Sequence, residues 1–187
     1  MRHITSFVFV LLWAGVMAGC AVPGETHAEA AKTVKQPLGR ADLTLYEVHH
    51  DGRIHVFYDK SVFNEFMSLG ETSFRLTRIG AGPHGETMVF GLTKKDKKMK
   101  KDIPAIDLYD GKIKADYFYA EMHKHGRIYV FNSFEDMQTV RDFGHPNFMF
   151  TEIGGGPKGE TVVFVLNKSN KKKKPDALIG DFKRRNS

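Results

Sequence analysis

The chain of 187 residues contains one cysteine, Cys20, and one tryptophan, Trp13. A lone thiol cannot form an intramolecular disulfide, so the folded part of the chain must be held together by its core. An exported domain usually carries cysteines in pairs, and an odd one therefore calls for a separate role.

Sequence motifs of common catalytic sites are also missing. The chain has no G-x-S-x-G nucleophile elbow and no H-E-x-x-H or C-x-x-C metal motif. We therefore predict that the protein is not an enzyme, and that it holds no cofactor and no metal ion.

The N-terminus has the order of charges and apolar residues that is typical of a secretory signal. A basic start, Met1-Arg-His3, precedes the apolar block Phe7–Met17, and small residues lead to Cys20. The block is shorter than the roughly 20 apolar residues that a membrane-spanning helix needs. We predict a signal peptide over residues 1–19.

The segment Val16-Met-Ala-Gly-Cys20 resembles the lipobox of bacterial lipoproteins, although Met17 stands where leucine is more usual. The resemblance implies that the thiol of Cys20 is lipidated and becomes the mature N-terminus. Ala21 after the cysteine implies sorting to the outer membrane of a Gram-negative cell, facing the periplasm or the surface. Acyl chains at one site anchor a protein stably without a transmembrane helix.

Residues 20–40 have no aromatic residue and no apolar period after Cys20. They are predicted to be a flexible tether between the lipid and the folded part.

The rest of the chain repeats itself. A shift without gaps lays Ala41-Asp42 on Ala115-Asp116 and Gly70 on Gly144, and it lays "IGAGPHGETMVF" at 79–90 on "IGGGPKGETVVF" at 153–164. We predict a gene duplication, with repeat 1 at 41–108, a linker at 109–114, repeat 2 at 115–182 and a basic tail at 183–187. The repeats resemble an uncharacterised bacterial lipoprotein family, which implies no activity.

Each repeat is predicted to be a β-β-α-β-β unit. In repeat 1, strands at 43–48 and 54–58 flank a glycine turn, a helix capped by Asp59 ends at Gly70, and strands at 73–79 and 86–92 follow. The predicted fold class is α+β, mainly an antiparallel sheet with one short helix per repeat. One repeat alone has a marginal core, so the two are expected to pack together with pseudo-twofold symmetry, with two separate beads as the alternative.

The glycine-rich loop in each repeat could be a phosphate cradle or a corner of the fold. A phosphate cradle needs a helix directly after the loop, whereas Glu86 and Glu160 are followed by residues typical of a strand. We therefore predict a wide turn with glycines at positive φ.

Three kinds of polar or aromatic residues were candidates for a site. The first kind could bind a metal ion, but its members lack the tight spacing of a metal-binding motif, so we predict no metal site. They are His49, His50, His55, His123 and His125, with Met122 and Met149. A duplicated pair, Glu47/Arg53 and Glu121/Arg127, is typical of a cross-strand salt bridge and less so of a catalytic group. In the alternative function, a small molecule or a metal ion is held between the repeats by Phe57, Phe131, His49 and His123.

Lysines at the end of each repeat are the most prominent surface feature. Their density attracts polyanions, and it also protects sheet edges from aggregation. The predicted binding residues for an anionic partner are Lys97, Lys98, Lys100, Lys101, Lys171, Lys172, Lys173 and Lys174. The chain is accordingly predicted to be a lipid-anchored, non-enzymatic binding or scaffolding module for an envelope protein or an anionic surface polymer. Nucleic acid is not an expected partner of an exported protein.

Overall fold

A computed structural model describes residues 44–113 and 117–187. The predicted signal peptide, Cys20 and the tether lie outside the described residues. Within the described part, no helix is both long enough and apolar enough to cross a membrane.

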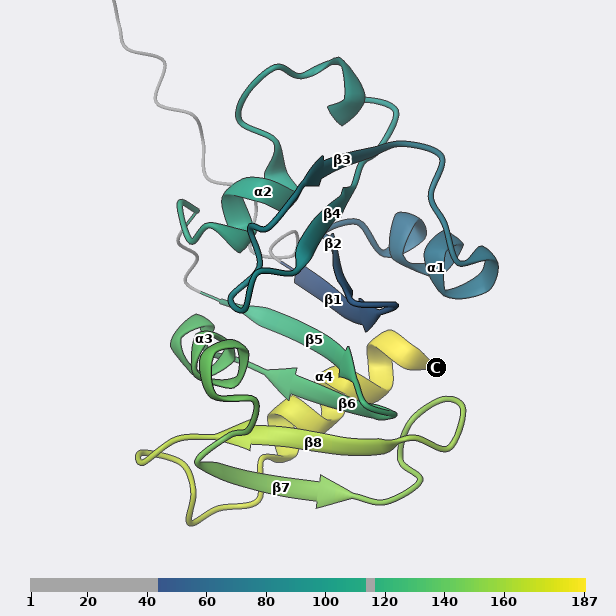
Figure 1. Cartoon of the computed structure of the whole chain (residues 1–187). Coiled ribbons are helices and arrows are strands. Elements are labelled where there is room, and N and C mark those ends of the chain that lie inside the picture. Colours follow the sequence, from purple (N-terminus) through teal and green to yellow (C-terminus); the bar gives the residue numbers. More distant parts are fainter. Residues whose placement is uncertain (1–43, 114–116) are drawn as a thin grey trace, which may run out of the picture. The chain divides into compact units, whose positions relative to one another are not determined.

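The strands of the described residues form a single sheet (Figure 1). Their bounds are β1 Thr44–His50, β2 Arg53–Phe57, β3 Arg75–Arg78, β4 Thr87–Gly91, β5 Tyr119–Lys124, β6 Arg127–Phe131, β7 Phe148–Glu152 and β8 Thr161–Leu166. Their order across the sheet is β3-β4-β2-β1-β5-β6-β8-β7. If β1, β2, β3 and β4 are matched with β5, β6, β7 and β8, the strand order counted from one edge equals the order counted from the other edge.

Among the described strands, four neighbouring pairs are antiparallel and three are parallel. The hairpins β1–β2 and β5–β6 and the pairs β3–β4 and β7–β8 are antiparallel. The two halves of the sheet join through β1 and β5, which run parallel, with Tyr46 opposite Glu121. The predicted α+β class with a mainly antiparallel sheet is confirmed.

Helices are more numerous than predicted. The described residues contain α1 Lys60–Leu69, α2 Pro104–Tyr109, α3 Phe134–Phe143, α4 Asp176–Asn186 and a 3₁₀ turn, η1 Asp96–Lys98. The prediction of one helix per repeat is wrong because α2 and α4 were missed. Both helices follow a stretch with lysines, proline and aspartate, which was interpreted as part of a loop. In α2, however, Pro104 is the first residue of the helix.

The two predicted helices, α1 and α3, begin and end as the sequence indicated. The carboxylate of Asp59 accepts hydrogen bonds from the amides of Ser61 and Val62, and the hydroxyl of Ser133 accepts one from the amide of Asp136. Gly70 and Gly144 close the helices in the left-handed conformation, with φ of 78° and 80°, where a side chain would be strained.

Both faces of the sheet are covered by helices. Along β1, Leu45 joins a core with α2 and α3, whereas Tyr46 joins a core with α1. Along β5, Ala120 contributes to the first of these cores, and Tyr119 to a core with α4. Since alternate residues of a strand point to opposite faces, α2 and α3 cover one face and α1 and α4 cover the other.

Candidate functional site

The lysines that follow β4 lie on a turn, residues 93–101, here called the first basic turn. Its one acid, Asp96, is buried and points inward, where it accepts hydrogen bonds from the amide and the hydroxyl of Thr93 at 2.9 and 2.6 Å. The backbone amide of Lys97 also bonds the carbonyl of Thr93 at 3.1 Å. The lysines Lys94, Lys95, Lys97, Lys98, Lys100 and Lys101 are exposed.

The second basic turn, residues 167–174, is built in the same way. Asn170 stands in place of Asp96, and its side-chain oxygen accepts a hydrogen bond from the amide of Asn167 at 2.8 Å. The amide of Lys171 bonds the carbonyl of Asn167 at 3.0 Å. Its lysines Lys168, Lys171, Lys172, Lys173 and Lys174 are exposed, and the turn contains no acidic residue.

One lysine of each turn packs on a phenylalanine at the edge of the sheet. Lys97 Nζ lies 4.1 Å from the ring centre of Phe74, and Lys171 Nζ lies 4.1 Å from that of Phe148. Each contact attaches its basic turn to the edge of the sheet. In the second turn, Lys174 Nζ also lies 5.8 Å from the ring centre of Phe150 and 3.6 Å from a carboxylate oxygen of Asp176.

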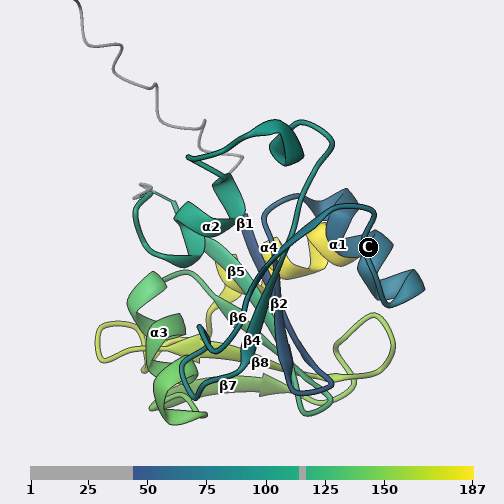
Figure 2. The same ribbon diagram turned by 45° about the horizontal axis from the view of Figure 1, so that its top comes forward.

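The two basic turns lie near opposite edges of the sheet. β4 and β8, from which they continue, are each second from an edge in the strand order. In both views the first turn is at the top and the second at the lower left (Figures 1 and 2). The predicted lysines therefore form two separate patches.

The glycine-rich loops are wide turns, as predicted. Gly80 and Gly85 have φ of 68° and 86°, and each loop passes directly into a strand, not into a helix. Glu86 folds over its loop and accepts a hydrogen bond from the amide of His84 at 2.8 Å, and Glu160 does the same for Lys158. The two loops lie apart in both views, so they do not line a shared cleft (Figures 1 and 2).

Glu47 lies fully buried in an ion pair with Arg141 of α3. Its Oε2 is 2.9 Å from Arg141 Nε, and its Oε1 is 2.7 Å from Nε2 of His49. Burial raises the pKa of Glu47, but the guanidinium of Arg141 and the imidazole of His49 outweigh it and leave the pKa below its usual value. Glu47 is thus an internal anion held between β1 and α3.

Glu121 is a second buried anion, on the opposite face of the sheet. Its Oε1 accepts hydrogen bonds from the hydroxyl of Tyr119 at 2.6 Å and from Asn186 of α4 at 2.9 Å. Its Oε2 lies 3.5 Å from Nε2 of His123. Burial acts to raise the pKa of Glu121, and the contacts with His123 and Tyr119 lower it by more.

The predicted Glu/Arg pairs do not form. Arg53 and Arg127 are exposed at the starts of β2 and β6, while Glu47 and Glu121 point into the two cores. The real partner, Arg141, was missed by the sequence reasoning. The available signal was its place on the apolar face of α3, four residues after Met137.

The four residues of the alternative function do not meet. Phe57 and His123 lie on the α1 face, where the ring of His123 is 5.3 Å from Phe63. His49 and Phe131 lie on the α3 face. A ligand cannot contact both pairs through the intervening sheet.

Two of the other candidate histidines, His50 and His55, lie beside the ring of Phe66. His55 packs on Phe66 with ring centres 4.3 Å apart, and burial together with nearby His50 and Arg53 lowers the pKa of His55 to about 4. His125 occupies the β5–β6 turn. Within residues 44–113 and 117–187, no group of three or more His, Cys, Asp or Glu side chains could hold a metal ion.

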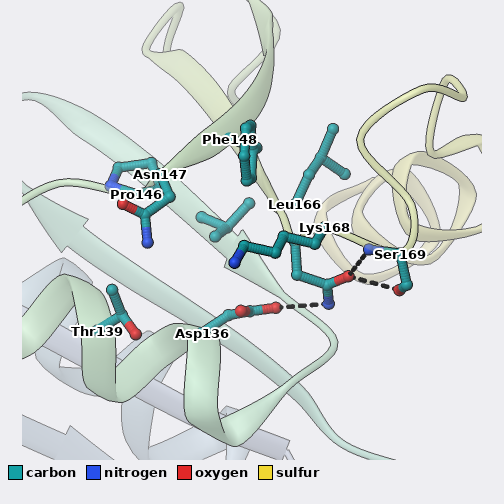
Figure 3. Close-up of a pocket in the computed structure, with 10 residues that line it drawn as sticks. Asp136, Thr139, Pro146, Asn147, Phe148, Leu166, Lys168 and Ser169 are labelled. Atoms are coloured by element: carbon teal, nitrogen blue, oxygen red, sulfur yellow. Dashed lines mark hydrogen bonds between the residues drawn. The ribbon is translucent and has the colours of Figure 1, made fainter.

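An open groove of about 830 Å³ lies between α3, the start of β7, the end of β8 and the second basic turn (Figure 3). Its lining residues are Asp136, Thr139, Pro146, Asn147, Phe148, Val165, Leu166, Asn167, Lys168 and Ser169. The sequence reasoning did not find this groove, because its lining comes from three separate segments of the chain.

In comparisons with known proteins, no family model, no curated protein and no solved structure matches this chain.

Proposed function

We propose that the protein is a non-enzymatic binding module for an anionic surface polymer. One observation carries the proposal: the two basic turns share one construction, with the acid or amide turned inward and the lysines exposed. An ordered turn loses less conformational entropy on binding than a flexible lysine tail would. The candidate acid–base groups Glu47 and Glu121 have no exposed surface, which favours binding over catalysis.

The separation of the two turns favours a scaffolding role. A long flexible polymer can reach both patches, although they lie near opposite edges of the sheet. Two linked sites also increase avidity, and they can join two polymer chains. A long anionic polysaccharide is therefore the partner that fits this arrangement best.

The anchor belongs to the same proposal. A lipid on Cys20 and the tether 20–40 would hold the domain at the outer membrane, facing the periplasm or the surface. Labelling cells with a fatty-acid probe tests the anchor, because the wild type should incorporate label and Cys20→Ser should not. An unlabelled wild type would refute lipidation.

We also propose that the domain arose by duplication, with a pseudo-twofold axis along the sheet between β1 and β5. Two features support this arrangement. The strand order reads the same from both edges, and α1 and α3 lie on opposite faces, as an axis within the sheet requires.

Binding to polygalacturonate, a linear polyanion, tests the proposed function. Replacing Lys97, Lys98, Lys100 and Lys101 by Gln should weaken binding, and the same change at Lys171–Lys174 should do so independently. The logarithm of the association constant should fall linearly with the logarithm of salt concentration, and each set of substitutions should make that slope less steep. The matched Lys→Arg sets keep the charge and should keep the affinity.

The proposal fails if the wild type does not bind the polymer, or if both Gln sets together leave the affinity unchanged. An envelope protein is the second candidate partner, favoured by Ile79 and Ile153, which are 88% and 90% exposed at the two glycine-rich loops. Crosslinking in the native envelope distinguishes the two candidates, because the attached species is identified directly.

A further inference from the structure

The groove beside α3 lies where a contact present in the first half of the sequence has no counterpart in the second half. In repeat 1 the Glu65 carboxylate of α1 accepts hydrogen bonds from the amide and the hydroxyl of Ser73, at 2.9 and 2.7 Å. These bonds join the helix to the segment that leads into the edge strand. When Gly70 is laid on Gly144, Thr139 and Asn147 stand at these two positions. Thr139 bonds the carbonyl of Glu135 in its own helix instead.

The groove combines a cation, amides, hydroxyls and an aromatic ring. Lys168 extends across it, with Asn147 beyond its amine and Phe148 above (Figure 3). Along the floor, Asn167 donates to the carboxylate of Asp136 at 3.0 Å and accepts from the hydroxyl of Ser169 at 2.6 Å. A few fixed polar groups beside apolar walls are typical of small-ligand sites of this size.

These groups fit a sugar acid better than a phosphate. The ammonium of Lys168 can pair with a carboxylate, and the apolar lining by Pro146, Phe148 and Leu166 offers a surface to a sugar ring. The carboxylate of Asp136 accepts hydrogen bonds from sugar hydroxyls but repels a phosphate dianion. This combination of groups favours a hydroxylated ring that carries a single negative charge.

The groove also opens onto the second basic turn. Lys168 lines the groove and is the first lysine of that turn, which continues to Lys171–Lys174. A polymer whose end lies in the groove thus passes directly over exposed lysines.

We propose that this groove binds one or two hexuronic acid units at the end of an acidic polysaccharide. The inference rests on the proposed function, which it extends from general attraction of a polyanion to recognition of its sugar. The groove contributes specificity, and the two basic turns contribute most of the affinity for long chains.

The test measures binding of digalacturonic acid to the full chain in detergent, by calorimetry, with neutral galactobiose as the control sugar. Grafting the repeat 1 contact with Thr139→Glu and Asn147→Ser should close the groove and raise the Kd at least about tenfold. The uncharged version, Thr139→Gln with Asn147→Ser, should raise the Kd by a similar factor. This result would show that the weaker binding does not come from the added negative charge. Lys168→Gln should weaken binding of the acid disaccharide, and galactobiose should bind weakly to all forms.

Short and long ligands separate the two proposals. If the wild type does not bind digalacturonic acid, or if both closed-groove variants bind it as the wild type does, the inference is overturned. Polygalacturonate binding that still depends on Lys171–Lys174 would then leave the proposed function standing. Disaccharide binding that is lost on groove closure supports the inference even where the long polymer shows no dependence on the basic turns.

Discussion

Arg141 is the residue on which the packing of α3 depends most. It is 2% exposed, its guanidinium pairs with Glu47 of β1, and its Cζ lies 4.2 Å from the ring centre of Tyr109 in α2. One side chain thus links two helices to a central strand. Breaking a buried ion pair from one side leaves an uncompensated charge, which costs more than the pair itself contributes.

Replacing Arg141 by Met, the residue that stands at the equivalent position 67 of repeat 1, should lower the free energy of unfolding by about 3–5 kcal/mol. Glu47 keeps its burial but loses its main counterion. Urea denaturation at neutral pH measures the change. Adding Glu47→Gln should recover a large part of the loss, because the unpaired charge is then removed.

The loss caused by Arg141→Met should depend on pH. In the wild type the pKa of folded Glu47 lies below its unfolded value, so the pair stabilises the fold above the unfolded pKa, and this stabilisation disappears as the pH falls through the folded pKa. The difference between wild type and variant should therefore shrink toward acid pH. A difference that stays constant from pH 7 to pH 3 would contradict the ion-pair interpretation.

At the scale of elements, α4 is the helix that completes the α1 face of the sheet. It buries Leu178, Ile179 and Phe182, and the ring centre of Phe182 lies 5.9 Å from that of Phe164 in β8. Its last turn contains Lys183, Arg184 and Arg185, which the sequence interpretation had assigned to a basic tail. Basic residues suit a helix C-terminus because they interact favourably with the free carbonyl groups there.

Phe182→Ala should destabilise the protein by about 3–5 kcal/mol, because it removes a fully packed ring and leaves a cavity against β8. Denaturant unfolding followed by far-UV circular dichroism measures the effect. Gly180→Ala on the same helix is the matched control, since a methyl group there has no atom within 4 Å. That control should be neutral or slightly stabilising. Equal losses for both variants would contradict the packing of α4 on the sheet.

At the scale of the molecule, the parallel pair β1–β5 makes one sheet of the two halves. Leu45 of β1 is fully buried in a core that also contains Met122 of β5 and Met137 of α3. Side chains from both halves therefore share one interior. The described part of the chain should consequently unfold as a single unit, which distinguishes it from two independent beads.

Leu45→Ala should lower hydrogen-exchange protection in both halves of the sheet, since its cost of about 2–5 kcal/mol falls on a shared core. Exchange followed by mass spectrometry should show faster exchange in β5, β6 and β8 as well as in β1, β2 and β4. Thr77→Ala, at an exposed position of β3, is the control and should change little. Faster exchange confined to β1–β4 would favour the two-bead alternative.

The local structure could be predicted from the sequence because its causes are local. Asp59, Ser133, Gly70 and Gly144 determine where two helices begin and end through contacts within a few residues. The turn glycines, followed by residues typical of strands, likewise excluded a phosphate cradle. The exposure of the lysines could be predicted from composition alone, because a dense run of charged residues cannot be buried.

The long-range arrangement was decided only by the tertiary structure. Nothing near Glu47 in the sequence marks Arg141 as its partner, because the ion pair depends on which face of the sheet α3 covers. The groove likewise needs Thr139 to lie opposite Asn147 and Lys168, which come from different segments. The sequence alone determined the turns, the ends of two helices and the charge, because short-range contacts and composition specify them. The packing of distant segments, including the β1–β5 pairing, decided which face of the sheet each helix covers. It also decided the buried ion pairs and the separation of the basic turns, because those features exist only once distant segments have packed.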